Sequence, residues 1–227
     1  MLSVAPDLRR WGMTRPTFAE LLAMPGVVED SVLRGRLGFM AYHGGGLEGT
    51  TDVIASRAAE LAGASYYGVV HPPDWGLHLP STRIDPDDSP RMAAFLDAVD
   101  VVITIHGYGR RPLLRSLLLG GRNRELAAHI AAHLRPALPA YVVVDDLDRI
   151  PTELRGIHER NPVNRPVHAG VQVELPPRVR GAGPLWWDWE GDLVPHTEAL
   201  IGALARAAAT YRHPASGVDQ LGAAIDA

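Results

Sequence analysis

The chain has 227 residues, of which 46% are hydrophobic, and its formal net charge is -4 at pH 7. The acidic balance argues against a nucleic-acid-binding protein, and the absence of cysteine excludes disulfides and thiolate metal ligands. The length suffices for one sizeable core, so we expect a single domain over residues 1–227, with its core at 34–212 and an N-terminal extension at 1–33 packed on that core.

Apolar runs of strand length alternate with segments of helical character along the chain. In chain order, the pattern predicts a strand at 36–42, a helix at 50–64, a strand at 64–71, a helix at 89–99, a strand at 100–106, a helix at 123–134, strands at 140–146 and 169–175, and a helix at 197–212. Thr50 or Thr51 is expected to cap the first helix, and Pro90 suits the first turn of the second. The alternation predicts an α/β fold, namely a mixed, largely parallel open sheet with helices on both faces.

The first residues lack the basic start and apolar centre of a signal peptide, and no apolar run reaches the length needed to cross a membrane. We therefore expect a cytoplasmic, monomeric protein without membrane contact, which lysis would release if the chain is phage-derived. Two proline-rich segments, 71–90 and 176–184, are predicted to be long functional loops.

Two of the predicted strands end on a histidine. The first histidine is His43, in the run MAYHGGGLEGT at 40–50, and the second is His106, in VVITIHGYG at 101–109. Glu48 follows five residues after the first histidine, beyond three glycines that allow a sharp turn. Two imidazoles and one carboxylate form a common open zinc site, in which a position remains for a water that the metal can acidify. These residues point to a hydrolase.

A third acidic candidate also lies at a strand end. Glu174 belongs to VQVEL, and open α/β sheets bind ligands at the carboxyl ends of their strands. A carboxylate in such a strand is costly to bury without a partner or a role. Each residue also has an ordinary structural interpretation: His43 as a turn residue, His106 as a core histidine, and Glu48 as a favourable charge at the start of the next helix.

All 22 basic residues are arginine. Five follow His106 closely: Arg110, Arg111, Arg115, Arg122 and Arg124. Because guanidinium groups bind carboxylates in a bidentate manner, an anionic substrate is one interpretation, and a solvated loop and helix surface is the other. His71 and His78, in the first proline-rich loop, are predicted to be surface or loop-packing residues.

Four segments carry a resemblance to a known family: HGGGLEGTTDVIA, LHLPSTRIDPDD, ITIHGY and NRPVHAGVQVELPPRVR. Over roughly residues 35 to 182 the chain resembles the phage and bacterial poly-γ-glutamate hydrolases, which are similar in fold to the zinc carboxypeptidases. The resemblance implies one Zn²⁺ per chain, held by His43, Glu48 and His106, with Glu174 as the general base that activates water.

The chain departs from the wider carboxypeptidase pattern in two places. Four residues, Gly44 to Leu47, separate the first histidine from its glutamate, where carboxypeptidases have two, and this longer spacing matches the polyglutamate branch. The Asn-Arg pair with which carboxypeptidases grip a terminal carboxylate precedes their third ligand, whereas Asn164 and Arg165 follow His106 here.

Further residues are candidates for the substrate. We predict that Arg83 polarises the scissile carbonyl, and that Arg165 and Arg180, with Asn164, hold substrate carboxylates. Tyr108, two residues beyond the second histidine, is expected to line the site, although a packed tyrosine at a strand end is the alternative interpretation.

The resemblance implies zinc-dependent hydrolysis of γ-glutamyl amide bonds, in poly-γ-glutamate or a related γ-glutamyl peptide. Two alternatives remain open. One is a deacylase or esterase of small N-acyl amino acids, which a shallow one-residue pocket would favour over an extended groove. The other is a catalytically silent module that binds polyanions through its arginines.

Overall fold

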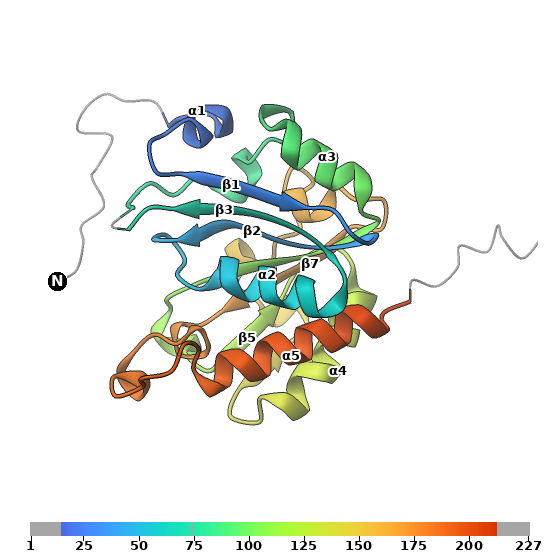
Figure 1. Cartoon of the computed structure of the whole chain (residues 1–227). Coiled ribbons are helices and arrows are strands. Elements are labelled where there is room, and N and C mark those ends of the chain that lie inside the picture. Colours follow the sequence, from blue (N-terminus) through green and yellow to red (C-terminus); the bar gives the residue numbers. More distant parts are fainter. Residues whose placement is uncertain (1–14, 74, 213–227) are drawn as a thin grey trace, which may run out of the picture.

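A computed structural model describes residues 15–73 and 75–212 (Figure 1). Within these residues, one sheet has the strand order β1-β3-β2-β4-β7-β5-β6. The strands are β1 (Val28–Val32), β2 (Leu37–Gly45), β3 (Ser65–His71), β4 (Val101–Gly107), β5 (Ser116–Leu119), β6 (Val142–Val144) and β7 (Gly170–Leu175). Neighbouring strands are parallel except β1 with β3 and β5 with β7. The predicted mixed, largely parallel sheet is confirmed.

Helices cover both faces of this sheet, as predicted (Figure 1). They are α1 (Phe18–Leu22), α2 (Thr51–Ala62), α3 (Pro90–Ala98), α4 (Arg124–Ala137) and α5 (Pro195–Thr210). Side chains of α2, α4 and α5 pack in one core, and those of α1 and α3 pack in the other. Among the described residues, no helix has both the length and the apolar character needed to span a bilayer.

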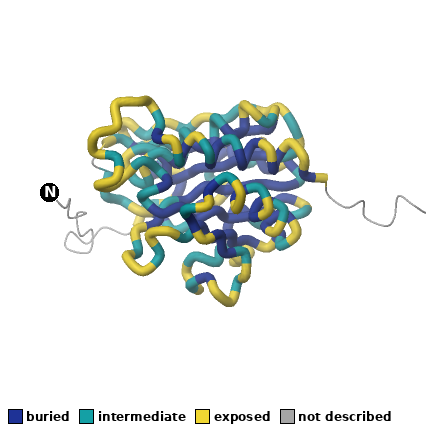
Figure 2. Tube along the Cα trace, turned by 90° about the horizontal axis from the view of Figure 1, so that it is seen from below, coloured by how far each residue is buried: buried dark blue, intermediate teal, exposed yellow. Residues whose placement is uncertain are grey.

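The central strands are buried on both faces, which is typical of parallel strands between helices (Figure 2). Side chains alternate between the faces, so that Phe39 joins the core under α2, α4 and α5, while Met40 and Tyr42 join the core under α1 and α3. In β4 and β7 the second face carries polar side chains near the carboxyl ends of the strands. This end of the second face forms the floor of the candidate site.

Three elements were not predicted, and each lacks the pattern that identifies longer ones. The edge strand β1 reads VEDSV, and its exposed and half-buried residues give no apolar run. The strand β5 and the helix α1 are four and five residues long. Part of the predicted N-terminal extension, β1, pairs with β3 in the sheet.

Thr50 stands at the N-cap position of α2, but its side chain does not cap the helix. Its φ of 75° is left-handed, and its hydroxyl instead donates to the carbonyl of Arg180 at 3.1 Å. The hydroxyl of Thr51 donates to the carbonyl of Glu48 at 2.8 Å. The predicted cap is therefore wrong, because both hydroxyls fasten the loop before the helix.

Candidate metal centre

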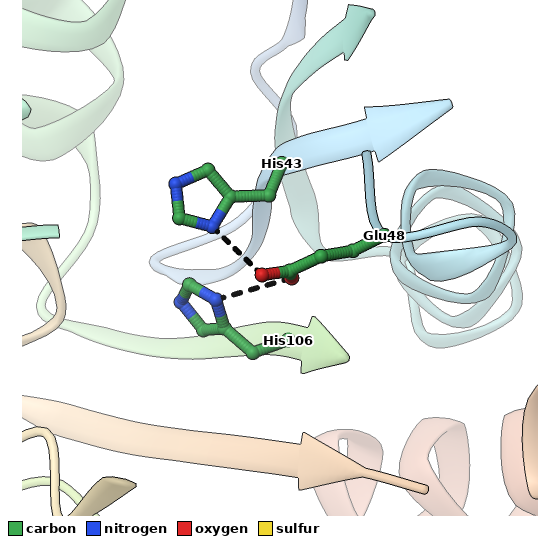
Figure 3. Close-up of side chains that lie close together, drawn as sticks. All are labelled: His43, Glu48 and His106. Atoms are coloured by element: carbon green, nitrogen blue, oxygen red, sulfur yellow. Dashed lines mark hydrogen bonds and ion pairs between the residues drawn. The ribbon is translucent and has the colours of Figure 1, made fainter. Parts of the chain in front are cut away.

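The candidate residues converge at the carboxyl ends of three adjacent strands. His43 lies near the end of β2, His106 lies near the end of β4, and Glu174 is the partner of His106 in register on β7. Glu48 comes from the loop between β2 and α2 (Figure 3). All four line one cavity of about 540 Å³.

The carboxylate of Glu48 lies between the two imidazoles, as Figure 3 shows. One carboxylate oxygen is 3.0 Å from Nδ1 of His43, and the other is 3.3 Å from Nδ1 of His106. One ligand atom from each residue can be chosen so that the three lie within 4.8 Å of one another. The predicted trio is thus together in space.

Glycine gives the loop after His43 its tight path. At Gly45 the φ angle is 66°, and a Cβ at Gly46 would lie 2.1 Å from the carbonyl oxygen of Pro72. The loop closes with the N–H of Glu48 donating to the carbonyl of His43 at 2.8 Å. The N–H of Gly107 then donates to the Glu48 carboxylate at 2.8 Å, which ties the loop to the end of β4.

Substitution of Gly46 by Ala is expected to displace this loop, because the new methyl group would overlap a backbone oxygen. We expect a loss of stability of about 1–3 kcal/mol, typical of overpacking, together with weaker zinc binding. Gly49 in the same loop is the matched control, since its Cβ would meet nothing closer than 3.7 Å. Chemical denaturation and zinc titration of both variants check this, and equal zinc affinity in the two would contradict it.

The hydrogen bonds on the far side of each imidazole set its tautomer. Nε2 of His43 lies 2.9 Å from the carbonyl oxygen of Leu79, which can only accept, so this nitrogen carries the proton. Nε2 of His106 lies 3.1 Å from the hydroxyl of Tyr42, which itself donates to Asn161 Oδ1 at 3.1 Å. Each imidazole is thus bound at Nε2 from behind and faces Glu48 with Nδ1.

This arrangement suits a cation. Two Nδ1 atoms and an anionic carboxylate face one another, and these nitrogens would offer lone pairs to a metal that displaced their protons. The donor set of two imidazoles and a carboxylate fits Zn²⁺, and a second hydrogen bond from each ligating imidazole is the usual support at such sites. With protons in place of a metal, burial raises the pKa of Glu48, but the two histidines outweigh burial and hold that pKa well below its ordinary value.

Glu174 is buried, and Gln172 Nε2 donates to its carboxylate at 2.8 Å. Burial raises the pKa of Glu174 to about 7, against the opposing influence of His106. A carboxylate that titrates near neutrality beside a metal centre has the proton affinity that a general base needs.

The predicted substrate residues are more dispersed. The guanidinium of Arg180 donates to the carbonyls of Gly49 and Leu175 and packs against Gly107, outside the cavity lining. Arg83 and Arg165 line a neighbouring cavity of about 290 Å³.

Two further candidates serve the framework. The side-chain amide of Asn164 donates to the carbonyls of Gly156 and His158, and its oxygen accepts from the N–H of Arg122. The hydroxyl of Tyr108 contacts two backbone carbonyls at 2.6 Å and its ring packs in a small apolar cluster. Neither side chain lines the cavity that holds His43, Glu48, His106 and Glu174.

Several residues that were not predicted from the sequence also line the cavity, among them His78, Asn161 and Gln172. The ring of His78 lies 4.6 Å from that of His43, centroid to centroid, and its Nε2 is 4.0 Å from the Glu48 carboxylate. Burial, and then the charge of His43, lower its pKa to about 4. The only signal for His78 was its place within a segment that carried the family resemblance.

Known proteins resemble this chain in sequence and in fold. The model of a family described as poly-gamma-glutamate hydrolase matches residues 20–182, which confirms the resemblance drawn from the motifs. A curated relative, the SPbeta prophage-derived UPF0714 protein YoqZ of Bacillus subtilis (strain 168), is 32% identical over 142 residues, or 62% of this chain. The chain spans about half, 48%, of the length of that relative.

Two solved structures share the fold. A bacteriophage poly-gamma-glutamate hydrolase superimposes with a TM-score of 0.68 at 21% identity, over 92% of this chain and 97% of the other. A zinc-free apo form of YNDL superimposes with a TM-score of 0.65, also at 21% identity, over 80% of this chain and 89% of the other. At these identities the likeness establishes the α/β fold.

Proposed function

Because the chain belongs to the poly-γ-glutamate hydrolase family, we propose that it hydrolyses γ-glutamyl amide bonds with the help of one zinc ion held by His43, Glu48 and His106. The observation that carries this proposal is the joint placement of these three side chains and the buried Glu174 in one cavity. A binding module without catalysis would need neither this group of two imidazoles and a carboxylate nor a second carboxylate, Glu174, with a pKa near 7.

The residues divide the chemistry between them. A bound zinc ion would supply Lewis acidity, which lowers the pKa of a water and polarises a carbonyl. Glu174 removes a proton from the attacking water while the oxygen of that water bonds to the amide carbon. When the carbon–nitrogen bond breaks, Glu174 returns that proton to the leaving nitrogen, so that a carboxylic acid and an amine are released.

The neighbouring cavity supports a polymer as the substrate. It shares Thr82 with the catalytic cavity, and the guanidinium groups of Arg83, Arg160 and Arg165 gather there. Among the described residues, the guanidinium groups of Arg160 and Arg165 have no hydrogen-bond or ion-pair partner. The carboxylates of Asp85 and Asp88, which line the same cavity, each accept a backbone N–H instead. We propose that these arginines bind the free carboxylates of the substrate residues that flank the scissile bond. For Arg83 this proposal takes the place of the predicted role in polarising the scissile carbonyl.

Hydrolysis assays on matched substrates test the function. We expect the purified chain to shorten γ-linked polyglutamate, to leave α-linked polyglutamate and N-acyl amino acids intact, and to stop when a chelator is added. Cleavage of N-acyl amino acids alone would favour the deacylase, and polymer binding without cleavage would favour the silent module.

The same assay locates the polymer site. Joint substitution of Arg160 and Arg165 by Gln is expected to raise KM for long γ-glutamyl oligomers roughly tenfold while leaving a γ-glutamyl dipeptide unaffected, because only the oligomers reach the second cavity. Arg206→Gln, at an exposed position on α5, is the control.

A further inference from the structure

Three buried polar side chains connect the metal centre to the proposed base: Tyr42, Asn161 and Gln172. Nε2 of His106 lies 3.1 Å from the hydroxyl of Tyr42, and that hydroxyl lies 3.1 Å from Oδ1 of Asn161. Nδ2 of Asn161 lies 2.8 Å from Oε1 of Gln172, and Nε2 of Gln172 lies 2.8 Å from Oε1 of Glu174. Four hydrogen bonds thus join an imidazole and a carboxylate through the protein interior.

Backbone groups fix the direction of both amides in this series. The N–H of Val163 can only donate, and it points to Oδ1 of Asn161 at 3.2 Å, so the amide nitrogen of Asn161 must face Gln172. Gln172 therefore accepts with its oxygen, and its nitrogen faces Glu174 and the carbonyl of Leu154, both of which accept. If the oxygen and nitrogen of either amide were exchanged, two donors or two acceptors would face each other.

The direction then extends to the histidine. Because Oδ1 of Asn161 has no proton, the hydroxyl of Tyr42 must donate to it. The oxygen of Tyr42 is left to accept, and its partner is the Nε2 proton of His106. Every bond runs from the imidazole toward the carboxylate.

The loop that supplies Asn161 is shaped to fit this series. Gly156, with a φ of 62°, approaches Gln172 so closely that a Cβ there would lie 2.6 Å from Oε1. Asn164 donates to the carbonyls of Gly156 and His158 and so holds the loop. An apolar side chain in place of any member would leave buried polar partners unpaired, which is unfavourable.

We propose that Tyr42, Asn161 and Gln172 are positioning residues that act together: Tyr42, held by Asn161, keeps the proton of His106 on Nε2 so that Nδ1 is free for the metal, and Gln172 fixes the orientation of the Glu174 carboxylate. This inference rests on the proposed function only for the part that concerns Glu174. The part that concerns His106 is a statement about metal binding and stands apart from any substrate.

Two variants separate the parts. Tyr42→Phe removes the acceptor of the His106 proton, so zinc affinity is expected to fall roughly 10- to 100-fold, the range found when such outer partners of a metal ligand are removed. Long-range proton–nitrogen NMR spectra should show a mixture of His106 tautomers in this variant and one tautomer in the native chain. Tyr67→Phe is the matched control, because Tyr67 is equally buried and its hydroxyl bonds Glu29 instead.

Gln172→Leu keeps Asn161 anchored on Val163 and removes the donor to Glu174. We expect kcat on γ-linked polyglutamate to fall at least tenfold, with KM and zinc affinity within about threefold of native values, in a protein whose circular dichroism is unchanged. Native zinc affinity and a single tautomer in folded Tyr42→Phe would overturn the first part. An unchanged kcat in Gln172→Leu would overturn the second. If the native chain cleaves no γ-glutamyl bond, the proposed function fails, while the Tyr42 measurements still decide the metal part.

Discussion

Replacement of Glu174 by Gln is expected to lower kcat by about 100- to 10,000-fold, because the amide cannot take a proton from water. Zinc content is expected to stay at the native level, since Glu174 is not among the three proposed ligands. The Gln oxygen can still accept from Gln172, so the fold is retained. Glu60→Gln, at an exposed position on α2, is the control.

The same variant should be more stable than the native chain above pH 7. The pKa of Glu174 is about 7 in the folded protein, above its ordinary value of 4.5, because the side chain is buried. Between these two values the unfolded chain loses the proton that the folded chain keeps, so the native protein loses stability as the pH rises, whereas Gln does not titrate.

Above pH 7 this pKa shift corresponds to a free energy of unfolding about 3 kcal/mol higher in the variant than in the native chain. Near pH 4 the two proteins should have nearly the same stability. Denaturation of the metal-free proteins across this range measures the difference. If the two proteins differ in stability equally at pH 4 and above pH 7, the raised pKa of Glu174 does not explain the difference. A native kcat in the Glu174→Gln variant would show that Glu174 takes no part in the reaction.

Simultaneous replacement of His43 and His106 by Ala is expected to abolish zinc binding, because two of the three proposed ligands are lost and Glu48 alone offers one carboxylate. Mass spectrometry of protein purified without added metal should find about one zinc per native chain and almost none in the variant. The control is His129→Ala with His133→Ala, a second pair of neighbouring imidazoles, on α4.

Hydrolysis should disappear with the metal in this variant, and added zinc should not restore it. A native chain that contains no zinc after reconstitution would overturn the metal centre, and the polyanion-binding module would then be the better hypothesis. Zinc that remains in the variant at the native level would mean that the metal binds elsewhere.

The residues that could be predicted from the sequence are those at or just beyond the carboxyl ends of strands. His43 and His106 each follow an apolar run, and parallel strands bring their carboxyl ends to one edge of the sheet. Glu48 was predictable because three glycines allow the loop to turn back within five residues. Local patterns and the fold class were enough to bring these side chains together, whereas their proposed role as metal ligands came from the family resemblance.

The residues that sequence reasoning missed depend on the paths of long loops. Asn161 reaches the site from a loop of single helical turns, and no local pattern marks it. His78 is brought beside His43 by the proline-rich loop after β3. Gln172 did leave a signal, since it alternates with valines on the same strand as Glu174 and so shares its face.

The supports of the metal site differ in what they demand of the sequence. His43 and Glu48 are held by backbone atoms, the carbonyl of Leu79 and the N–H of Gly107, which no change of side chain removes directly, although close neighbours confine Gly46 and Gly107 to glycine. His106 is held by a tyrosine hydroxyl that one mutation can delete. During evolutionary drift a change at a glycine would reach Glu48 through the backbone, whereas a change at Tyr42 would reach His106 directly through the lost hydrogen bond.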